Sequence, residues 1–178
     1  MKKQVASIVA SVVLLTGLSG GLASADTCSV TWGSGAKSAG PTTSATRQIT
    51  NIRTGRHTCF DRMVIDINNA TAAGYRVEYV SNIYADPSGE LIPISGGAKL
   101  QIVTYAGAYK PDGTITYPAL TGKKLPNLNL TGYQTFRDAK FAGSFEGVSS
   151  VGLGVRARLP FTVFKSSNHI VIDVAHHW

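Results

Sequence analysis

Apolar and polar residues alternate with a period of two from Arg47 onward, and this pattern limits the folds that the chain can adopt. The runs DRMVIDI (61–67) and VGLGVRARL (151–159) both place apolar side chains at every second residue. Turn sequences rich in Gly and Pro, such as DPSG (86–89), separate runs of this kind. Only residues 68–74 suggest a helical turn, so the crossover helices of a parallel sheet are not expected. The pattern predicts an all-β, two-sheet antiparallel β-sandwich with little helix.

Two of the expected strands have nearly the same sequence, DRMVIDI at 61–67 and NHIVIDV at 168–174. Each places a polar residue, a Val and an Asp on one face, with Asp66 in the first run and Asp173 in the second. Coincidence would explain the likeness, since Val and Ile are common in buried strands. The alternative is a pseudo-repeat, in which the two halves of the sandwich each contribute an equivalent central strand.

The first 25 residues read as a bacterial signal peptide rather than as part of the fold. Two lysines precede a short apolar run, and ASA (23–25) offers the small residues of a cleavage site before Asp26. The apolar run is shorter than the roughly 20 residues that a spanning helix needs, so we expect no membrane span after cleavage. We therefore expect a secreted chain of residues 26–178, extracellular and associated with the cell wall.

Both cysteines, Cys28 and Cys59, lie in the exported part, and an even count in an oxidising compartment favours a disulfide. The alternative is a Cys59–His57 nucleophilic pair, for which no orienting third group is evident. The disulfide would tie an N-terminal arm and flexible loop (26–48) to the folded domain (49–178). Within that arm, residues 33–45 are small and polar and are expected to form a flexible connector.

Charge and motifs argue against nucleic acid as a partner and against known catalytic sites. Removal of the two signal-peptide lysines lowers the net charge from +7 by two, to +5, and the remaining cations form no basic stripe. A weak attraction to anionic wall polymers is the more natural expectation. GSFEG (143–147) lacks the G-x-S-x-G spacing, and no zinc-ligand spacing is present. We expect no enzyme, metal or cofactor, although a pocket holding two titratable groups in contact would favour a hydrolase.

Two side chains near these motifs are assigned structural positions. His57 is expected on the surface beside the disulfide, and HHW (176–178) is expected to be a frayed end. The alternatives for this end are binding of a stray transition metal and docking of Trp178 on the core.

The strand residues Asp66 and Asp173 need partners, because a carboxylate within an apolar run must be exposed or paired. Cross-strand pairing with Arg62, Arg156 and Arg158 predicts a structural charge ladder on one sheet face. The functional alternative is an arginine-lined face that binds a wall carboxylate through its forked guanidinium groups.

Tyrosines supply the other candidate binding groups. Tyr109 and Tyr117 flank the KPDG turn and are expected to be the exposed pair, suited to contact with sugars or peptides.

Several motifs together resemble a known family. In order along residues 49–178 they are TGRHTCFDRMVIDI, GYRVEYV, GGAKLQIV, SFEGVSSVGLGVRARLPFTVF and NHIVIDVAHHW. This set is similar to the AMIN-like domain of secreted actinobacterial proteins, a relative of the AMIN domain of cell-wall amidases and secretins. The resemblance implies a two-sheet β-sandwich that targets the envelope by binding peptidoglycan. Because no amidase or secretin sequence follows Trp178, we expect a free-standing domain.

The resemblance implies a secreted, non-catalytic cell-envelope domain that binds peptidoglycan or an associated wall polymer. On this interpretation Arg62, Arg156, Arg158, Tyr109 and Tyr117 contact the ligand, and the protein is a monomer. The alternative is a protein-interaction module, either an inhibitor or an accessory subunit of an envelope protein.

Overall fold

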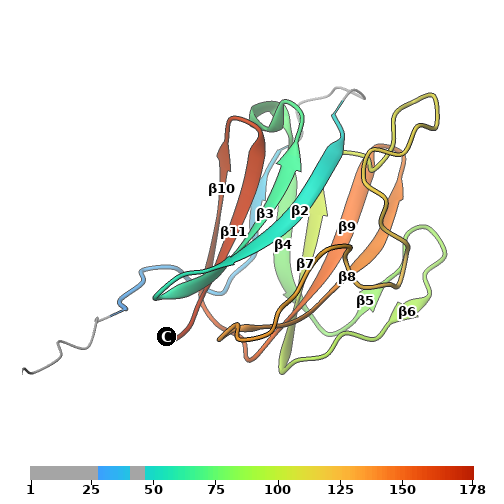
Figure 1. Cartoon of the computed structure of the whole chain (residues 1–178). Helices are drawn as coiled ribbons and strands as arrows, with labels where there is room; N and C mark the ends of the chain where they lie inside the picture. Colours follow the sequence, from blue (N-terminus) through green and yellow to red (C-terminus); the bar gives the residue numbers. More distant parts are fainter. Residues whose placement is uncertain (1–27, 41–46) are drawn as a thin grey trace, which may run out of the picture.

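Two antiparallel sheets pack face to face in the computed structural model, which describes residues 28–40 and 47–178 (Figure 1). The five-stranded sheet has the order β1 (Lys37–Ala39), β4 (Tyr75–Val80), β7 (Ala98–Thr104), β9 (Val148–Val155) and β8 (Phe136–Phe145). The four-stranded sheet has the order β10 (Phe161–Ser166), β11 (His169–Ala175), β3 (Phe60–Ile67) and β2 (Ile49–Arg56). The expected all-β sandwich is confirmed. The expected signal peptide lies outside the described residues.

Among the residues that the structure describes, helix is confined to one 3₁₀ turn, η1 (Ala70–Ala72), within the loop where a helical turn was expected. Throughout the described ranges, no helix has the length and apolar character needed to cross a membrane.

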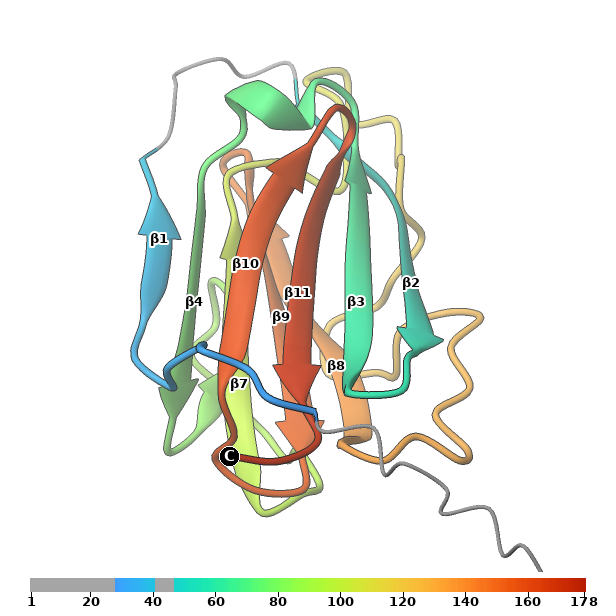
Figure 2. The same cartoon turned by 90° about the vertical axis from the view of Figure 1, so that its left-hand side faces the viewer.

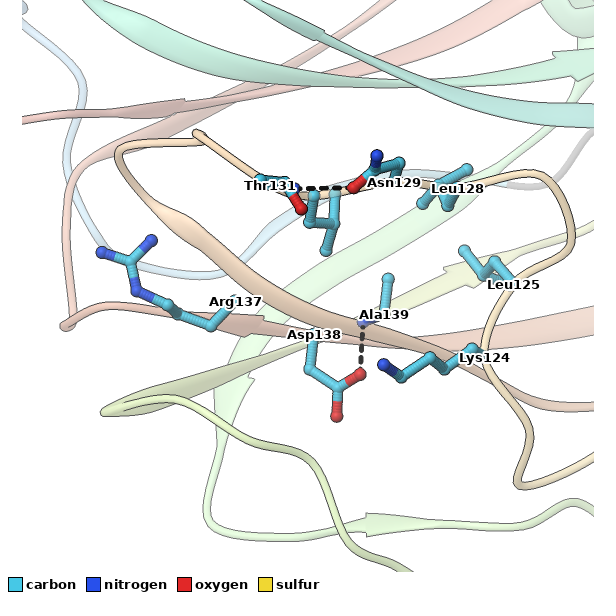
Figure 3. Close-up of a pocket in the computed structure, with 9 residues that line it drawn as sticks. Lys124, Leu125, Leu128, Asn129, Thr131, Arg137, Asp138 and Ala139 are labelled. Atoms are coloured by element: carbon cyan, nitrogen blue, oxygen red, sulfur yellow. Dashed lines mark hydrogen bonds between the residues drawn. The ribbon is translucent and has the colours of Figure 1, made fainter.

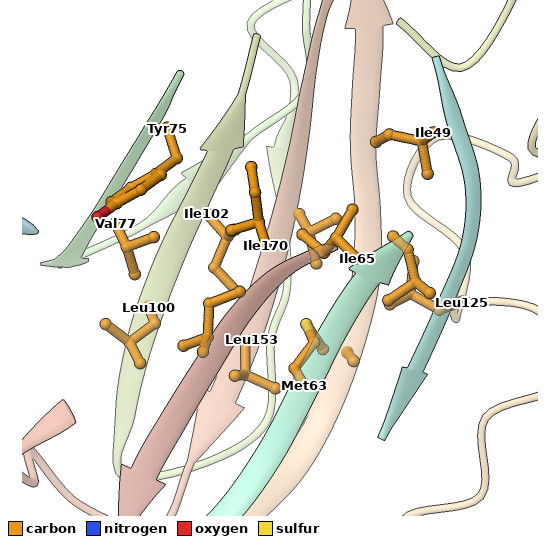
Figure 4. Close-up of a cluster of buried hydrophobic side chains, with 14 of the residues drawn as sticks. Ile49, Met63, Ile65, Tyr75, Val77, Leu100, Ile102, Leu125, Leu153 and Ile170 are labelled. Carbon is orange, nitrogen blue, oxygen red and sulfur yellow. The ribbon is translucent and has the colours of Figure 1, made fainter. Parts of the chain in front are cut away.

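The core lies between the two sheets, where the inward-facing residues of each strand interdigitate. Figure 4 shows Met63, Ile65 and Ile170 of the four-stranded sheet beside Leu100 and Leu153 of the five-stranded sheet, and all five are fully buried. Burial of each such side chain contributes about 1.5–3 kcal/mol. The period-two pattern of the sequence therefore corresponds to one buried face on each strand.

The two similar heptads form β3 and β11, which are the central pair of the four-stranded sheet. They run antiparallel with Val64 opposite Val171, so the residues of one heptad pair with those of the other in reverse order. This register places Arg62 opposite Asp173 and Asp66 opposite His169. The pattern of a cationic residue, a Val and an Asp is thus self-complementary in an antiparallel pair.

The resulting charge ladder lies on the outer face of the sheet. The Arg62 guanidinium binds Asp173 through two hydrogen bonds, both of 2.7 Å, and these raise the pKa of Arg62. Asp66 is paired with Arg53 of β2, with Nε 3.1 Å from Oδ2. The His169 Nδ1 atom lies 2.7 Å from Asp66 Oδ1, a contact that is an ion pair only when the ring is protonated. The ladder therefore uses Arg62 but neither Arg156 nor Arg158.

The outer face of the five-stranded sheet is covered by a small flap. The flap contains β5 (Ile83–Tyr84) and β6 (Leu91–Ile92), which pair with each other and appear at the lower right of Figure 1. Gly152 and Gly154 of β9 lie beneath it, and a Cβ atom at Gly154 would overlap the Ser95 carbonyl. The alternate glycines of β9 therefore permit close packing of the flap on the sheet.

Residues 33–45 were expected to form a flexible connector, and this expectation is wrong for β1. Lys37–Ala39 pairs antiparallel with β4, as Figure 2 shows at the edge of the sheet. Lys37 Nζ donates to the carbonyls of Gly33 and Gly35 and lies 4.1 Å from the centroid of the Phe161 ring. Residues 41–46 are outside the described part.

The expected disulfide joins Cys28 to Cys59. It holds the N-terminal arm beside the turn between β2 and β3. A bridge that closes a loop of this length stabilises a fold by about 3–4 kcal/mol in the chain-entropy model.

We expect unequal effects from removing the two ladder carboxylates. Asp173→Asn leaves a half-buried guanidinium unpaired and should lower the free energy of unfolding by about 2 kcal/mol, while the exposed Asp66–Arg53 pair makes Asp66→Asn cost less than about 1 kcal/mol. Urea denaturation of both variants measures the difference. A loss for Asp66→Asn that equals or exceeds the loss for Asp173→Asn would contradict this account.

Candidate functional site

One end of the sandwich brings together five segments that are distant in sequence, and four of them carry cations. The segments are 56–59, 95–99, 132–137, 156–158 and 176–178. They contribute Arg56, Lys99, Arg137, Arg156 and Arg158 and contain no acidic residue. Backbone hydrogen bonds join them, from Arg156 N to Thr135 O and from His176 N to Cys59 O. We call this surface the basic end; it lies at the bottom of Figure 2, beside the C-terminus.

Two acidic residues near the basic end, Asp61 and Asp138, are buried and already paired. Asp61 has no exposed surface, and its Oδ2 accepts hydrogen bonds from the backbone N–H groups of Thr135 (2.6 Å) and Phe136 (3.0 Å). Asp138 accepts hydrogen bonds from the N–H groups of Ser95 and Ala139. Neither carboxylate is exposed at the surface, and neither forms an ion pair with an arginine or lysine of the basic end.

The guanidinium groups of the basic end are held by neutral oxygens. Arg137 donates to the carbonyls of Tyr133, Gln134 and Phe136, and thereby orders the loop before β8. Arg156 donates to the carbonyl of His176. Among the described residues, these guanidinium groups form no salt bridge. Their positions are fixed while their charges remain available to an anion.

His176 fills the interior of this end, so the expectation that residues 176–178 are frayed is wrong for this residue. Its ring is buried, with Nδ1 3.1 Å from Thr58 O and Nε2 3.1 Å from Asp61 Oδ1. Both ring nitrogens therefore face oxygen atoms, and neither is free to take a proton from a substrate. The Asp61–His176 contact is the pair of titratable groups that would favour a hydrolase, but its geometry supports a structural role.

A polar pocket opens above this pair and is the first hollow of the basic end. It has a volume of about 530 Å³ and is lined by Arg56, His57, Gln134 and the Asp61–His176 pair. His57 is exposed and stacks on Phe60 with 4.5 Å between ring centroids. We call this polar pocket the end pocket.

A second hollow lies on the other side of the loop before β8 and is drawn in Figure 3. This loop pocket has a volume of about 300 Å³. Lys124 and Arg137 lie on either side of Asp138 and Ala139, while Asn129 and Thr131 come from the loop that passes over them. Both pockets are shallow and polar and have cations at their rims, which suits them to anionic polymers rather than to small apolar ligands.

The sequence-predicted binding residues do not gather at one place. Arg156 and Arg158 both lie at the basic end, whereas Arg62 lies on the outer face of the four-stranded sheet and is paired with Asp173. Tyr109 and Tyr117 belong to the loop at the opposite end of the sandwich (Figure 1).

Tyr117 was expected to be exposed, and this is wrong. Only 3% of its surface is exposed, and its ring packs edge-to-face on Phe141. Its hydroxyl has no hydrogen-bond partner in the described part of the chain, and burial raises its pKa. Tyr109 is half-buried and lines an apolar pocket with Tyr117, Ile115 and Leu120.

Arg56, Lys124 and Arg137 were not singled out from the sequence, although each is exposed at the site. Isolated cations carry no spacing signal, and only the tertiary structure brings them together. Over the same described ranges, no three His, Cys, Asp or Glu residues are grouped to hold a metal ion.

Comparison with known proteins gives one match. The family model of the AMIN-like domain matches residues 47–176. No curated protein and no solved structure matches the chain.

Asp61→Asn should destabilise the protein by about 3 kcal/mol, because the amide cannot satisfy two backbone N–H groups and the His176 ring as the carboxylate does. Asp112→Asn is the matched control: this exposed residue caps a turn, and its change should stay within about 0.5 kcal/mol. Denaturant titrations compare the two, and equal stabilities would refute the role given to Asp61.

Tyr117→Phe should keep or raise stability at neutral pH by up to about 1 kcal/mol, because it removes an unpartnered buried hydroxyl. The pKa of Tyr117 is raised in the folded protein, so wild-type stability is full below the ordinary tyrosine pKa and falls as pH rises above about 10. The advantage of the variant should therefore grow with pH in thermal melts.

Tyr79→Phe is the comparison for this variant. It removes two hydrogen bonds of 2.9 Å with Leu159 and should cost about 1–2 kcal/mol. A Tyr117→Phe protein that is as unstable as Tyr79→Phe would contradict the assignment.

Proposed function

The chain belongs to the AMIN-like family, since the match covers most of its length, and from this premise we propose that it is a non-catalytic cell-envelope domain that binds peptidoglycan or an associated wall polymer. The proposal includes export after cleavage of residues 1–25 and a monomeric folded domain over residues 49–178. The family match supports the envelope role, and the basic end supplies the binding surface.

The observation that carries the proposal is that the basic end holds five cations, while the neighbouring carboxylates of Asp61 and Asp138 are buried. The segments that carry these cations contain no acidic residue. Wall polymers carry carboxylates on their peptides and phosphates on their accessory chains. Guanidinium groups bind both through paired hydrogen bonds, and two polar pockets give room beside them. Several cations that act on one polymer give avidity without a deep pocket.

A protein-interaction module is the second candidate, and it is favoured by the apolar pocket at the opposite end. Ile115 and Leu120 are 68% and 70% exposed and flank this pocket. An exposed apolar surface of this kind is typical of a protein contact. The two candidate functions use opposite ends of the sandwich and can therefore be separated by variants.

Co-sedimentation of the exported protein with purified sacculi tests the proposal. Arg56→Gln/Lys124→Gln removes one cation from the end pocket and one from the loop pocket, and neither forms an ion pair within the described residues. It should reduce the bound fraction about fivefold or more at physiological salt. Arg76→Gln/Lys110→Gln changes the net charge equally, outside the basic end, and should bind as the wild type does.

A second comparison shows which wall component supplies the bound anion. For it, the accessory anionic polymers are stripped from half of the sacculi. Retained binding assigns peptidoglycan itself, and lost binding assigns the accessory polymer. Failure of the wild-type protein to sediment with either preparation would refute the envelope proposal, as would equal losses for the two double variants.

A further inference from the structure

Trp178 presents an indole ring that is held in place yet left open to solvent. Its side chain is 72% exposed, more than any other large apolar side chain among the described residues. The indole Nε1–H donates to the carbonyl of Arg158 at 3.0 Å. The only polar group of the ring is thus satisfied by the protein, while its flat face remains free for a ligand.

Arg158 beside it is also fixed. Its Nε and Nη2 atoms donate to the hydroxyl and carbonyl oxygens of Ser34, at 3.3 and 3.2 Å. Its guanidinium carbon lies 5.0 Å from the centroid of the Tyr79 ring. Tyr79 is in turn held by Leu159 through the two hydrogen bonds described above. The cation is therefore ordered by neutral groups and has no carboxylate partner in the described structure.

Arg158 also lines a shallow groove. Its volume is about 290 Å³, and it is lined by polar and small residues that include Ser81, Gly97 and Lys99. Lys99 gives the groove a second cation, and no acidic residue lines it. Arg158 thus links the exposed indole, which donates to its carbonyl, to the cationic groove, which it lines together with Lys99.

The combination of an exposed aromatic face with the cations Arg158 and Lys99 matches the chemistry of an acidic saccharide. A pyranose ring has an apolar face of C–H bonds that stacks on an aromatic ring, and its hydroxyl groups hydrogen-bond to polar side chains. A carboxylate on the sugar would meet Arg158 and Lys99. We infer that Trp178, Arg158 and Lys99 form a subsite for a carboxylate-bearing sugar, with the sugar ring stacked on Trp178. This subsite rests on the proposed function, because it assigns the sugar of the wall polymer to one part of the basic end.

Intrinsic fluorescence reports on contact with this ring directly. The chain has two tryptophans, and Trp32 packs edge-to-face on Phe60 at 5.6 Å. Trp32→Phe leaves Trp178 as the single tryptophan of the exported protein. The probes are a peptide-free disaccharide of N-acetylglucosamine and N-acetylmuramic acid, which carries a carboxylate, and neutral chitotetraose.

The acidic disaccharide should shift the Trp178 emission to shorter wavelength, with an affinity at least about tenfold higher than that of chitotetraose. Calorimetry of variants in the wild-type background then assigns the contacts. Trp178→Ala should weaken binding of the disaccharide about tenfold, and Trp178→Phe, which keeps a flat ring, should restore most of it. Phe145→Ala removes a 47% exposed aromatic side chain from the opposite end and should have no effect.

Arg158→Gln should remove the preference for the acidic over the neutral sugar. An emission spectrum that neither sugar changes would overturn the subsite, and so would equal binding by wild type and Trp178→Ala. The sacculus assay keeps the two proposals distinct. If wild type sediments with sacculi but Trp178 does not respond to sugar, only the subsite fails; if Trp178 responds but sacculi are not bound, only the proposed function fails.

Discussion

The carboxylate of Asp61 joins three parts of the chain that are far apart in sequence, and the architecture of the basic end depends on it. Asp61 is on β3 of one sheet and binds the N–H groups of Thr135 and Phe136, where β8 of the other sheet begins. It also contacts the ring of His176, which follows β11. A buried carboxylate is stable only with such partners. The interaction thus closes the sandwich at this end and at the same time removes a negative charge from its surface.

The pairing of β3 with β11 explains why the chain contains two similar heptads. Alternation could be predicted from the sequence, because a strand with one buried face requires it whatever its partner is. The pairing of the strands could not be predicted, because no local sequence signal specifies which strands are neighbours. In the structure, the antiparallel register puts Arg62 opposite Asp173 and His169 opposite Asp66. Two strands with this same pattern therefore place opposite charges next to each other when they pair antiparallel. The similarity of the two heptads thus has a physical explanation in the register of the pair.

The features that the sequence did not reveal all depend on tertiary contacts. The short strand β1 has a polar, Gly-flanked sequence, and its pairing comes from the edge of β4. The polarity of Tyr117 and its place next to a turn suggested exposure, but Phe141 and its neighbours bury it. His176 lies near an end of the sequence, where fraying is common, but its ring is held inside by Asp61 and the Thr58 carbonyl, and its backbone by Cys59 and Arg156. Of the basic end, the sequence identified Arg156 and Arg158 but not the residues beside them.

The order of the basic end bears on how strongly it can bind. A flexible cation loses conformational entropy when it is immobilised on a ligand, at about 0.5–1.5 kcal/mol for each side chain. Arg137, Arg156 and Arg158 are already held by carbonyl and hydroxyl oxygens, so much of that cost is met during folding. Because these partners are neutral, the order is gained without cancelling the charge. On the proposed function, this end of the sandwich would bind a repeating anionic polymer through several weak contacts, whose protein side chains are in place before the polymer arrives.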